Sequence, residues 1–264
     1  MQQRRFLVGT YTTVRAARGV YLCAMSASGR IDVLDECAMR DPSFIVLHPE
    51  LSLAYVVNET PEPHGGLTVI HVDGDRLKQR QQVSSGGHLP CHLTLLAGAR
   101  ALAVTHYGCG TISVFAVDAN GALTDERASW VHRGAAGHSS RQRTAHPHCV
   151  VEGQGVLHIT DLGQDLIVSY AADPWREIAR CAIHAGAGPR HLCVAPSGTA
   201  AWLSNELDNT VSRLAVETGG RLVELDWVGT LPADYAGRSY VSEIAVHPNG
   251  RWLYVGNRGH DSIA

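Results

Sequence analysis

The chain has 264 residues, of which 45% are hydrophobic and 18% charged, with 22 basic residues against 25 acidic ones and a formal net charge of −3. This balance offers no basic surface to nucleic acid or to an anionic membrane. The sequence also contains no run of 18 apolar residues, which is about the length needed to span a bilayer. We therefore predict a small molecule or a protein as partner, and neither nucleic acid nor a membrane.

The N-terminal part begins with three β-like segments, RFLVGTY, GVYLCAMSASG and RIDVLDECAM. The first residues, MQQRRFLVGTYT, lack the apolar region of a secretory signal. The seven cysteines include no CxxC pair and are typical of reduced core or turn residues. These features predict a cytoplasmic protein.

A repeated pattern follows, about every 45 to 55 residues: an apolar run, a turn, a second apolar run and then a polar residue. The repeats begin at Pro42, Pro90, Pro147, Pro189 and Val241. Their second runs end at Asn58, His106, Asp161, Asn205 and Asn257, and each is followed by further β-like sequence. Short strands in units of this length are the signature of a β-propeller, with one blade per unit. We predict an all-β fold in which residues 1–264 form a single propeller domain.

The two ends of the chain break this pattern. RFLVGTY matches the second strand of a repeat, so the first blade lacks its first strand, and the last blade stops at DSIA, inside its third strand. A propeller avoids open strand edges by pairing its terminal blades. We therefore expect a chain that is truncated at the C-terminus, with about five and a half blades. The alternative is a six-bladed ring with an incomplete last blade.

The candidate site follows from hairpin geometry. In an antiparallel hairpin, the start of the first strand and the end of the second lie at the same edge, so these positions should share one face of the propeller. The opposite edge carries ordinary turns, in which we expect His48 and His247 to be turn residues. The candidate positions at strand starts are His92, His146, His148, Arg190 and His191, and those at strand ends are Glu59, Tyr107, Asn205, Glu206, Asn257 and Arg258.

These residue types fit acid–base chemistry on an anionic substrate. Arginine binds phosphate or carboxylate in a bidentate manner, and a nearby Glu or His can move a proton or orient a water molecule. The long loop GAAGHSSRQRTA, which contains Arg141, has the length and composition of a functional loop. A structural salt bridge between Glu206 and Arg258 is the alternative interpretation of that pair.

Metal and cofactor sites have little support in the sequence. His146 and His148 stand two residues apart and could share a metal ion, but no third ligand follows at a recognisable spacing. The chain also lacks the GxSxG, GxxxxGK[ST] and GxGxxG motifs. We predict no metal and no cofactor.

Several motifs together resemble the lactonase family of seven-bladed propellers, which includes the propeller type of 6-phosphogluconolactonase and, more distantly, carboxy-muconate lactonising enzymes. They are GTYT, PSFIVLHP with YVVNE, PCHL, Arg141-Gln142 before HPHCV, GPRHLCVAPSG with LSNEL, and IAVHPNGRWLYVGNRGHDSIA. The resemblance covers almost the whole chain. It implies catalytic roles for His148, Arg190, Glu206 and Arg258. Departures include His106 in place of an Asn and Cys149 in place of a Ser.

The resemblance implies a hydrolase that opens a sugar lactone, 6-phosphogluconolactone to 6-phosphogluconate, in the pentose phosphate pathway. Arg190 and Arg258 would hold the anionic group, while Glu206 or His148 activates water; the sequence leaves open which of them is the base. The predicted substrate-binding residues are His146, His191, Glu59, His92, Tyr107, Arg141, Asn205 and Asn257. A muconate-type cycloisomerase and an inactive binding scaffold are the alternatives, and the oligomeric state stays open.

Overall fold

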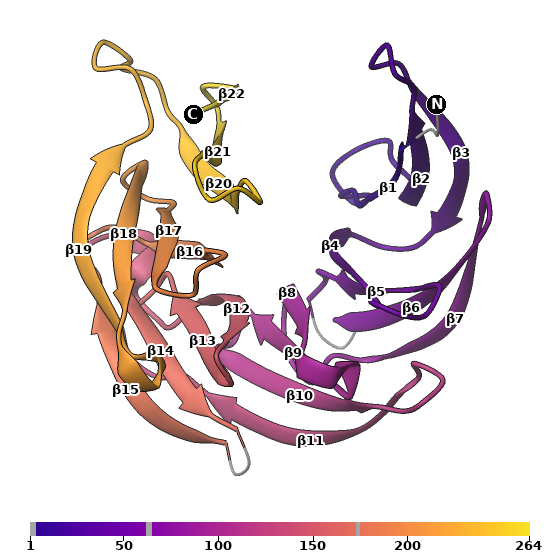
Figure 1. The fold of residues 1–264 in the computed structure, drawn as a ribbon, viewed down its shortest axis with the longest axis horizontal. Coiled ribbons are helices and arrows are strands. Elements are labelled where there is room, and N and C mark those ends of the chain that lie inside the picture. The colour runs from indigo at the N-terminus through magenta and orange to yellow at the C-terminus, as the bar shows by residue number, and fades with distance from the viewer. Residues whose placement is uncertain (1–3, 62–64, 173–174) are drawn as a thin grey trace. The chain divides into compact units, whose positions relative to one another are not determined.

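A computed structural model describes residues 4–61, 65–172 and 175–264, apart from the side chains of residues 125–127. The chain forms two compact units, residues 1–131 and 132–264. Within the described ranges its regular secondary structure is almost entirely β-strand, and the strands form six antiparallel sheets (Figure 1). No helix in those ranges is long and apolar enough to cross a membrane.

The first unit contains three sheets whose strands follow sequence order. The first sheet has three strands, β1 (Arg4–Val8), β2 (Gly19–Met25) and β3 (Ile31–Ala38). The second has β4 (Pro42–Leu47), β5 (Leu53–Asn58), β6 (Gly66–Asp73) and β7 (Arg76–Ser84). The third has β8 (Pro90–Leu95), β9 (Ala101–His106), β10 (Thr111–Val117) and β11 (Leu123–Val131), with the short 3-10 turn η1 (Ala97–Ala99) between β8 and β9.

The second unit repeats this plan. After the 3-10 turn η2 (Ser140–Gln142), one sheet contains β12 (Pro147–Gly153), β13 (Val156–Asp161), β14 (Leu166–Ala171) and β15 (Arg176–Ala182). The next contains β16 (Pro189–Val194), β17 (Ala200–Asn205), β18 (Thr210–Val216) and β19 (Leu222–Gly229), with η3 (Thr218–Gly220) before β19. The last contains β20 (Tyr240–Val246), β21 (Leu253–Arg258) and β22 (Ser262–Ile263).

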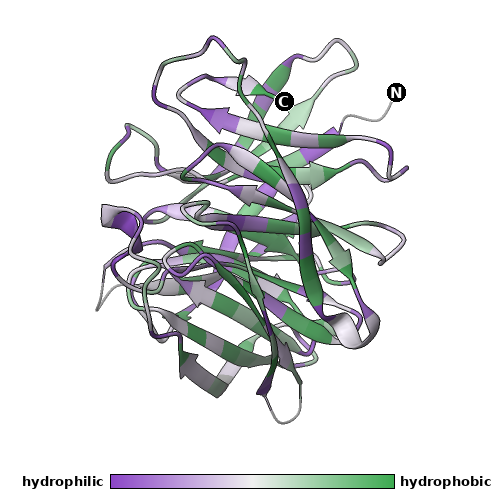
Figure 2. Ribbon diagram, turned by 90° about the vertical axis from the view of Figure 1, so that its left-hand side faces the viewer, coloured by the Kyte–Doolittle hydropathy of each residue, from purple (hydrophilic) through white to green (hydrophobic). Residues whose placement is uncertain are grey.

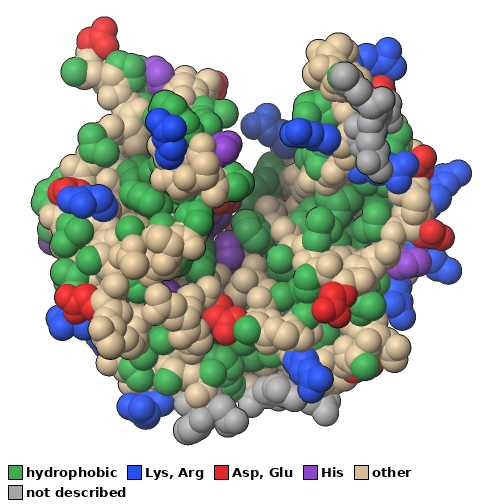
Figure 3. Space-filling view, in the orientation of Figure 1, with side chains coloured by type: hydrophobic (Ala, Val, Ile, Leu, Met, Phe, Trp, Pro, Cys, Tyr) green, Lys and Arg blue, Asp and Glu red, His purple; other side chains and the backbone are tan. Residues whose placement is uncertain are grey.

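Hydrophobic residues join neighbouring sheets within each unit. Single strands interleave hydrophobic residues with polar ones, as Figure 2 shows, so each sheet can bury side chains against the next. In the first unit, Tyr55, Leu67 and Leu102 belong to one buried cluster. In the second, Ile167 and Leu203 join the sheets that begin at β12 and β16. On the face drawn in Figure 3, basic and acidic side chains are interspersed, without a field of one sign.

The turns at one edge of the hairpins agree with the sequence. His48 Nδ1 accepts hydrogen bonds from the amides of Glu50 and Leu51 at 3.1 and 2.9 Å, and His247 Nδ1 accepts one from Asn249 at 3.1 Å. Both histidines therefore close turns, as predicted. All seven cysteines are free, and five of them are buried.

The first strands of the repeats share an irregularity that matters for the site. Pro189 pairs with Asn205 and His191 with Ser204, so Arg190 is one extra residue, a β-bulge. The same shift occurs at Ser43, Cys91 and His148. A bulge re-aims its side chain away from the regular alternation of the strand. We call these four residues the bulge positions.

The polar residues that end the second strands share a different role. Asn58 Nδ2 donates to the Arg40 carbonyl at 2.8 Å, and its Oδ1 accepts from Thr68 Oγ1 at 2.7 Å. His106 Nδ1 lies 3.0 Å from the Thr111 carbonyl oxygen and donates to it, because that oxygen can only accept. These side chains tie the end of the second strand to neighbouring backbone and strands.

Candidate active site

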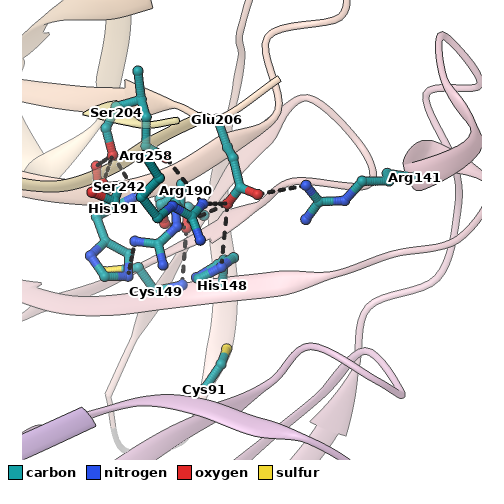
Figure 4. A network of polar contacts seen from close by, with 12 residues as sticks. Cys91, Arg141, His148, Cys149, Arg190, His191, Ser204, Glu206, Ser242 and Arg258 are labelled. Carbon is teal, nitrogen blue, oxygen red and sulfur yellow. Dashed lines mark hydrogen bonds and ion pairs between the residues drawn. The ribbon is translucent and has the colours of Figure 1, made fainter. Parts of the chain in front are cut away.

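One buried carboxylate, Glu206, organises the strongest polar cluster of the second unit (Figure 4). It follows β17, and its side chain is only 5% exposed. Arg141 NH1 lies 2.5 Å from Oε1, while Arg190 Nε and Arg258 NH2 lie 2.9 and 3.1 Å from Oε2. Arg141 approaches from the side opposite to Arg190 and Arg258. Three cations thus face one carboxylate, and positive charge is in excess.

Each cation reaches Glu206 from a different element. Arg190 stands at the bulge position of β16, and Arg258 is the last residue of β21. Arg141 belongs to η2, in the long loop that the sequence singled out. Hairpin pairing alone brings Pro189 opposite Asn205, which places Arg190 beside Glu206. The predicted convergence of strand starts and strand ends is therefore present within this unit.

The loop that carries Arg141 is held by buried polar contacts. Gln142 is fully buried and donates through Nε2 to the Leu162 carbonyl at 3.1 Å and to Asp165 Oδ1 at 2.6 Å. Gly163 permits a close approach, because a Cβ there would stand 1.8 Å from the carbonyl oxygen of Thr144. Gln142 and Gly163 thereby fix the position from which Arg141 extends.

The arginines set the ionisation of the site. Burial alone would raise the pKa of Glu206, but the three guanidinium charges outweigh burial and lower that pKa. Burial is also the largest influence on Arg258 and lowers the pKa of its guanidinium. A carboxyl whose pKa is lowered and whose oxygens are occupied is a weak base near neutral pH.

His148 lies next to this cluster at the bulge position of β12. Its Nε2 is 3.8 Å from Glu206 Oε2, which is ion-pair distance but too long for a hydrogen bond. Its ring meets the His191 ring edge-on, with centroids 5.2 Å apart. His148 thus lies at the border of the cationic cluster, within ion-pair distance of Glu206.

His191 and Glu243 form a second layer behind Arg190. His191 Nδ1 lies 3.0 Å from Glu243 Oε2, and Arg190 NH1 lies 3.1 Å from His191 Nε2. Burial, followed by the charge of Arg190, lowers the pKa of His191. This favours a neutral imidazole between the two charged groups.

The remaining predicted residues of the second unit bond elsewhere. Asn205 is fully buried and donates to Thr210 Oγ1 and Ser212 Oγ at 2.9 and 2.7 Å. Asn257 donates to the Thr230 carbonyl and to Ser262 Oγ at 3.2 Å each. Both belong to the strand-end contacts described above. His146 precedes β12, and its Nε2 lies 3.2 Å from Thr144 Oγ1.

Three of the predicted residues, Glu59, His92 and Tyr107, belong to the first unit. Glu59 Oε2 accepts a hydrogen bond from the Tyr11 hydroxyl at 2.7 Å. His92 is buried, and its ring packs against Phe44 with centroids 4.0 Å apart. Tyr107 follows β9, and its backbone amide donates to the Leu89 carbonyl at 2.9 Å. The roles of all three in binding a ligand stay predictions.

Sequence reasoning missed Glu243, Gln142 and Asp165. When VSEI of the last repeat is aligned with PRHL of the preceding one, Glu243 takes the position of His191. The repeat therefore contained a signal for Glu243. Gln142 stood in the motif Arg141-Gln142, but the motif did not show its anchoring role, and Asp165 gave no signal, because both roles depend on how a loop docks. Among the residues described, no group of three or more His, Cys, Asp or Glu side chains could hold a metal ion.

Comparison with known proteins agrees with this architecture. A sequence profile described as "Lactonase, 7-bladed beta-propeller" matches residues 5–264. A 6-phosphogluconolactonase of Bacillus subtilis is 28% identical over 97% of this chain and 75% of its own length. The structure of a Pseudomonas aeruginosa periplasmic gluconolactonase superposes with a TM-score of 0.91 at 28% identity, covering 99% of this chain and 77% of that one. A Lactobacillus plantarum protein reaches the same TM-score, with 28% identity, over 100% of this chain and 78% of its own.

The fold and the profile together define an all-β propeller of the lactonase type. The chain belongs to the lactonase family of seven-bladed β-propellers, and it is an enzyme of the lactonase class. Its substrate is a lactone, a cyclic ester. The predicted fold class and family are confirmed.

Proposed function

We propose that this enzyme hydrolyses an anionic sugar lactone, and that 6-phosphogluconolactone, opened to 6-phosphogluconate, is its substrate. The observation that carries the proposal is the excess of guanidinium charge around Glu206. An ionised carboxylate already balances one cation, so the others are available to a phosphate. The name of the Bacillus subtilis relative supports the same substrate.

We assign the proton transfers to His148. Glu206 is occupied by three arginines and its pKa is lowered, which makes it an anchor for those cations. In this mechanism His148 accepts a proton from water as the water oxygen attacks the lactone carbonyl carbon. The ring carbon–oxygen bond then breaks, and His148 returns the proton to the leaving alkoxide. The products are a carboxylic acid, which ionises, and the freed hydroxyl group.

Arg190 and Arg258 have two roles in this mechanism. Arg190 is held at Nε and NH1, and its NH2 has no hydrogen-bond partner among the residues described, so that nitrogen can donate to a developing oxyanion. Arg258 has a half-exposed side chain and is placed to bind the anionic group of the substrate. Arg141 adds charge from the opposite side.

The test compares two lactones on the purified protein. Hydrolysis of 6-phosphogluconolactone and of glucono-δ-lactone is followed at equal concentrations, with spontaneous opening subtracted. We expect kcat/KM to be at least tenfold higher for the phosphorylated lactone, since a phosphate can form charge-assisted bonds that a hydroxyl cannot. Equal rates, or a preference for the neutral lactone, would overturn the proposed substrate while leaving the lactonase class in place.

A further inference from the structure

Arg190 is oriented by a chain of contacts that begins at Glu243, a residue with no role so far. Glu243 lies in the bulge between Val241 and Ile244 of β20, and its carboxylate reaches His191 of the neighbouring sheet. His191 in turn contacts Arg190, which contacts Glu206. This series of contacts therefore connects β20, β16 and the residue after β17, all within the second unit.

The hydrogen-bond donors in this series of contacts fix the position of the ring hydrogen of His191. A guanidinium carries only donors, so Arg190 NH1 must donate to His191 Nε2, and that nitrogen must bear a lone pair. The ring hydrogen is then on Nδ1, where it points at Glu243 Oε2, 3.0 Å away. A carboxylate that accepts this hydrogen stabilises the tautomer in which Nε2 can accept.

We infer that Glu243 is a positioning residue of the lactonase site: by fixing the Nδ1–H tautomer of His191, it holds the Arg190 guanidinium with NH2 directed to the ligand. Without an acceptor at Nδ1, His191 can place its hydrogen on Nε2, and two donors then face each other. Arg190 would lose one of its two anchors. The catalytic consequence rests on the proposed lactone hydrolysis, but the tautomer does not.

Each ring nitrogen of His191 has a charged partner. Arg190 and Glu243 occupy the two ring nitrogens, the His148 ring packs against the His191 ring in a T-shaped arrangement, and Glu206 acts on the ring through its charge. The backbone amide of His191 is held separately, through Ser204 Oγ at 3.1 Å. The ring can therefore change tautomer while the strand keeps its place.

The experiment compares Glu243→Ala with Glu243→Gln. Both substitutions remove the negative charge, but only glutamine keeps an oxygen that can accept from Nδ1. We expect kcat/KM for the lactone to fall about threefold in E243Q and at least tenfold in E243A, mainly through kcat. Glu217→Gln, which neutralises an exposed carboxylate 3.6 Å from Arg221, is the matched control and should leave kcat/KM unchanged.

The tautomer is measured directly from the nitrogen chemical shifts of labelled histidine, with His191 assigned from His191→Asn. We expect a neutral ring with its hydrogen on Nδ1 in the native protein and in E243Q, and a shift toward Nε2–H in E243A. A charged His191 or an Nε2–H tautomer in the native protein would overturn the inference. Equal kinetic losses in E243A and E243Q would also overturn it. If no variant opens the phosphorylated lactone, the proposed substrate fails, and the nitrogen shifts still decide the role of Glu243.

Discussion

Two sheets of this protein carry the same Asn-Glu pair at the same place and use its glutamate differently. Asn58-Glu59 follows β5 in the first unit, and Asn205-Glu206 follows β17 in the second. Asn58 and Asn205 both tie the strand end to its neighbours. Glu59, however, meets a tyrosine hydroxyl, whereas Glu206 meets three guanidiniums.

The difference lies in the residues that surround each pair. The bulge position is Ser43 in the sheet of Glu59 and Arg190 in the sheet of Glu206. The repeat therefore decides where a glutamate stands, and side chains at equivalent positions decide its chemistry. Substitutions at matched positions can test this distinction.

The largest loss of lactonase activity is expected for Glu206→Gln, and Glu59→Gln is the variant to compare it with. Loss of the carboxylate leaves three guanidiniums facing one another, so E206Q should reduce lactonase kcat/KM by roughly a hundredfold or more. It should also lower the free energy of unfolding by about 2 kcal/mol, since the arginines are partly solvated. E59Q should change each quantity only slightly. Kinetics and urea unfolding of both variants provide the measurement, and similar losses in the two would contradict the distinction.

The second effect concerns two bulge positions. His148→Asn removes the proton carrier and should lower kcat by roughly a hundredfold or more, with an unchanged melting temperature. Ser43→Ala, at the same position of another sheet, should keep nearly all activity. The comparison is made from the pH dependence of kcat, where the limb that belongs to His148 should disappear in H148N. A bell-shaped profile that persists in H148N would move the proton transfer to another residue.

The third prediction concerns His106, at the end of β9, and the stability of the folded protein at low pH. Burial lowers the pKa of His106 from 6.5 to about 4. The unfolded chain therefore binds a proton between these values while the folded protein does not, so folding stability falls as the pH drops from about 6.5 toward 4. His106→Asn supplies the residue found in three other repeats and should remove up to about 3 kcal/mol of this loss.

Urea unfolding of His106→Asn and of the unmodified protein at pH 7 and pH 4.5 measures that change. Asn is smaller than His, so H106N should be less stable at pH 7 because of the space left beside Gly87. The gap between the two proteins should narrow or reverse at pH 4.5. A gap that does not depend on pH would show that His106 titrates normally.

The smallest effect separates two neighbouring arginines of the long loop. Arg141 contacts Glu206, whereas Arg143 is exposed. Arg141→Ala should raise KM for the phosphorylated lactone about tenfold, as expected for one charge-assisted contact, and should weaken the preference over the neutral lactone. Arg143→Ala should leave both values unchanged. An equal rise in KM for the two variants would mean that Arg141 acts only through general electrostatic attraction and not through a specific contact.

Much of the fold could be predicted from the sequence because the repeat is regular. Strand starts at Pro42, Pro90, Pro147 and Pro189 coincide with the observed strands, and hairpin pairing places Arg190 next to Glu206. The family followed from the same motifs. These features depend on local pattern and on one rule of pairing, which a single sequence contains.

The details of the site could not be predicted in the same way. Alternation along a strand does not reveal a bulge, so the sequence could not show that Arg190 and His148 stand at bulge positions. It also could not show that Asn205 and Asn257 turn into the sheet while the residues after them reach the cluster. The anchoring of Arg141 through Gln142 and Asp165 depends on contacts between distant segments. The proposed choice of His148 over Glu206 as base rests on the charges around Glu206, which the sequence does not show.

The recurrent bulges have a consequence for how such a protein can change. The proline before each bulge and the pairing after it are backbone features, so the strand can keep its register while the bulge side chain differs, from Ser43 and Cys91 in the first unit to His148 and Arg190 in the second. Inheritance of the scaffold and selection of the reaction are thereby largely separated. A lineage could change the chemistry beside Glu206 by exchanging the side chains of His148 and Arg190, and a laboratory library restricted to those two codons would sample the same route.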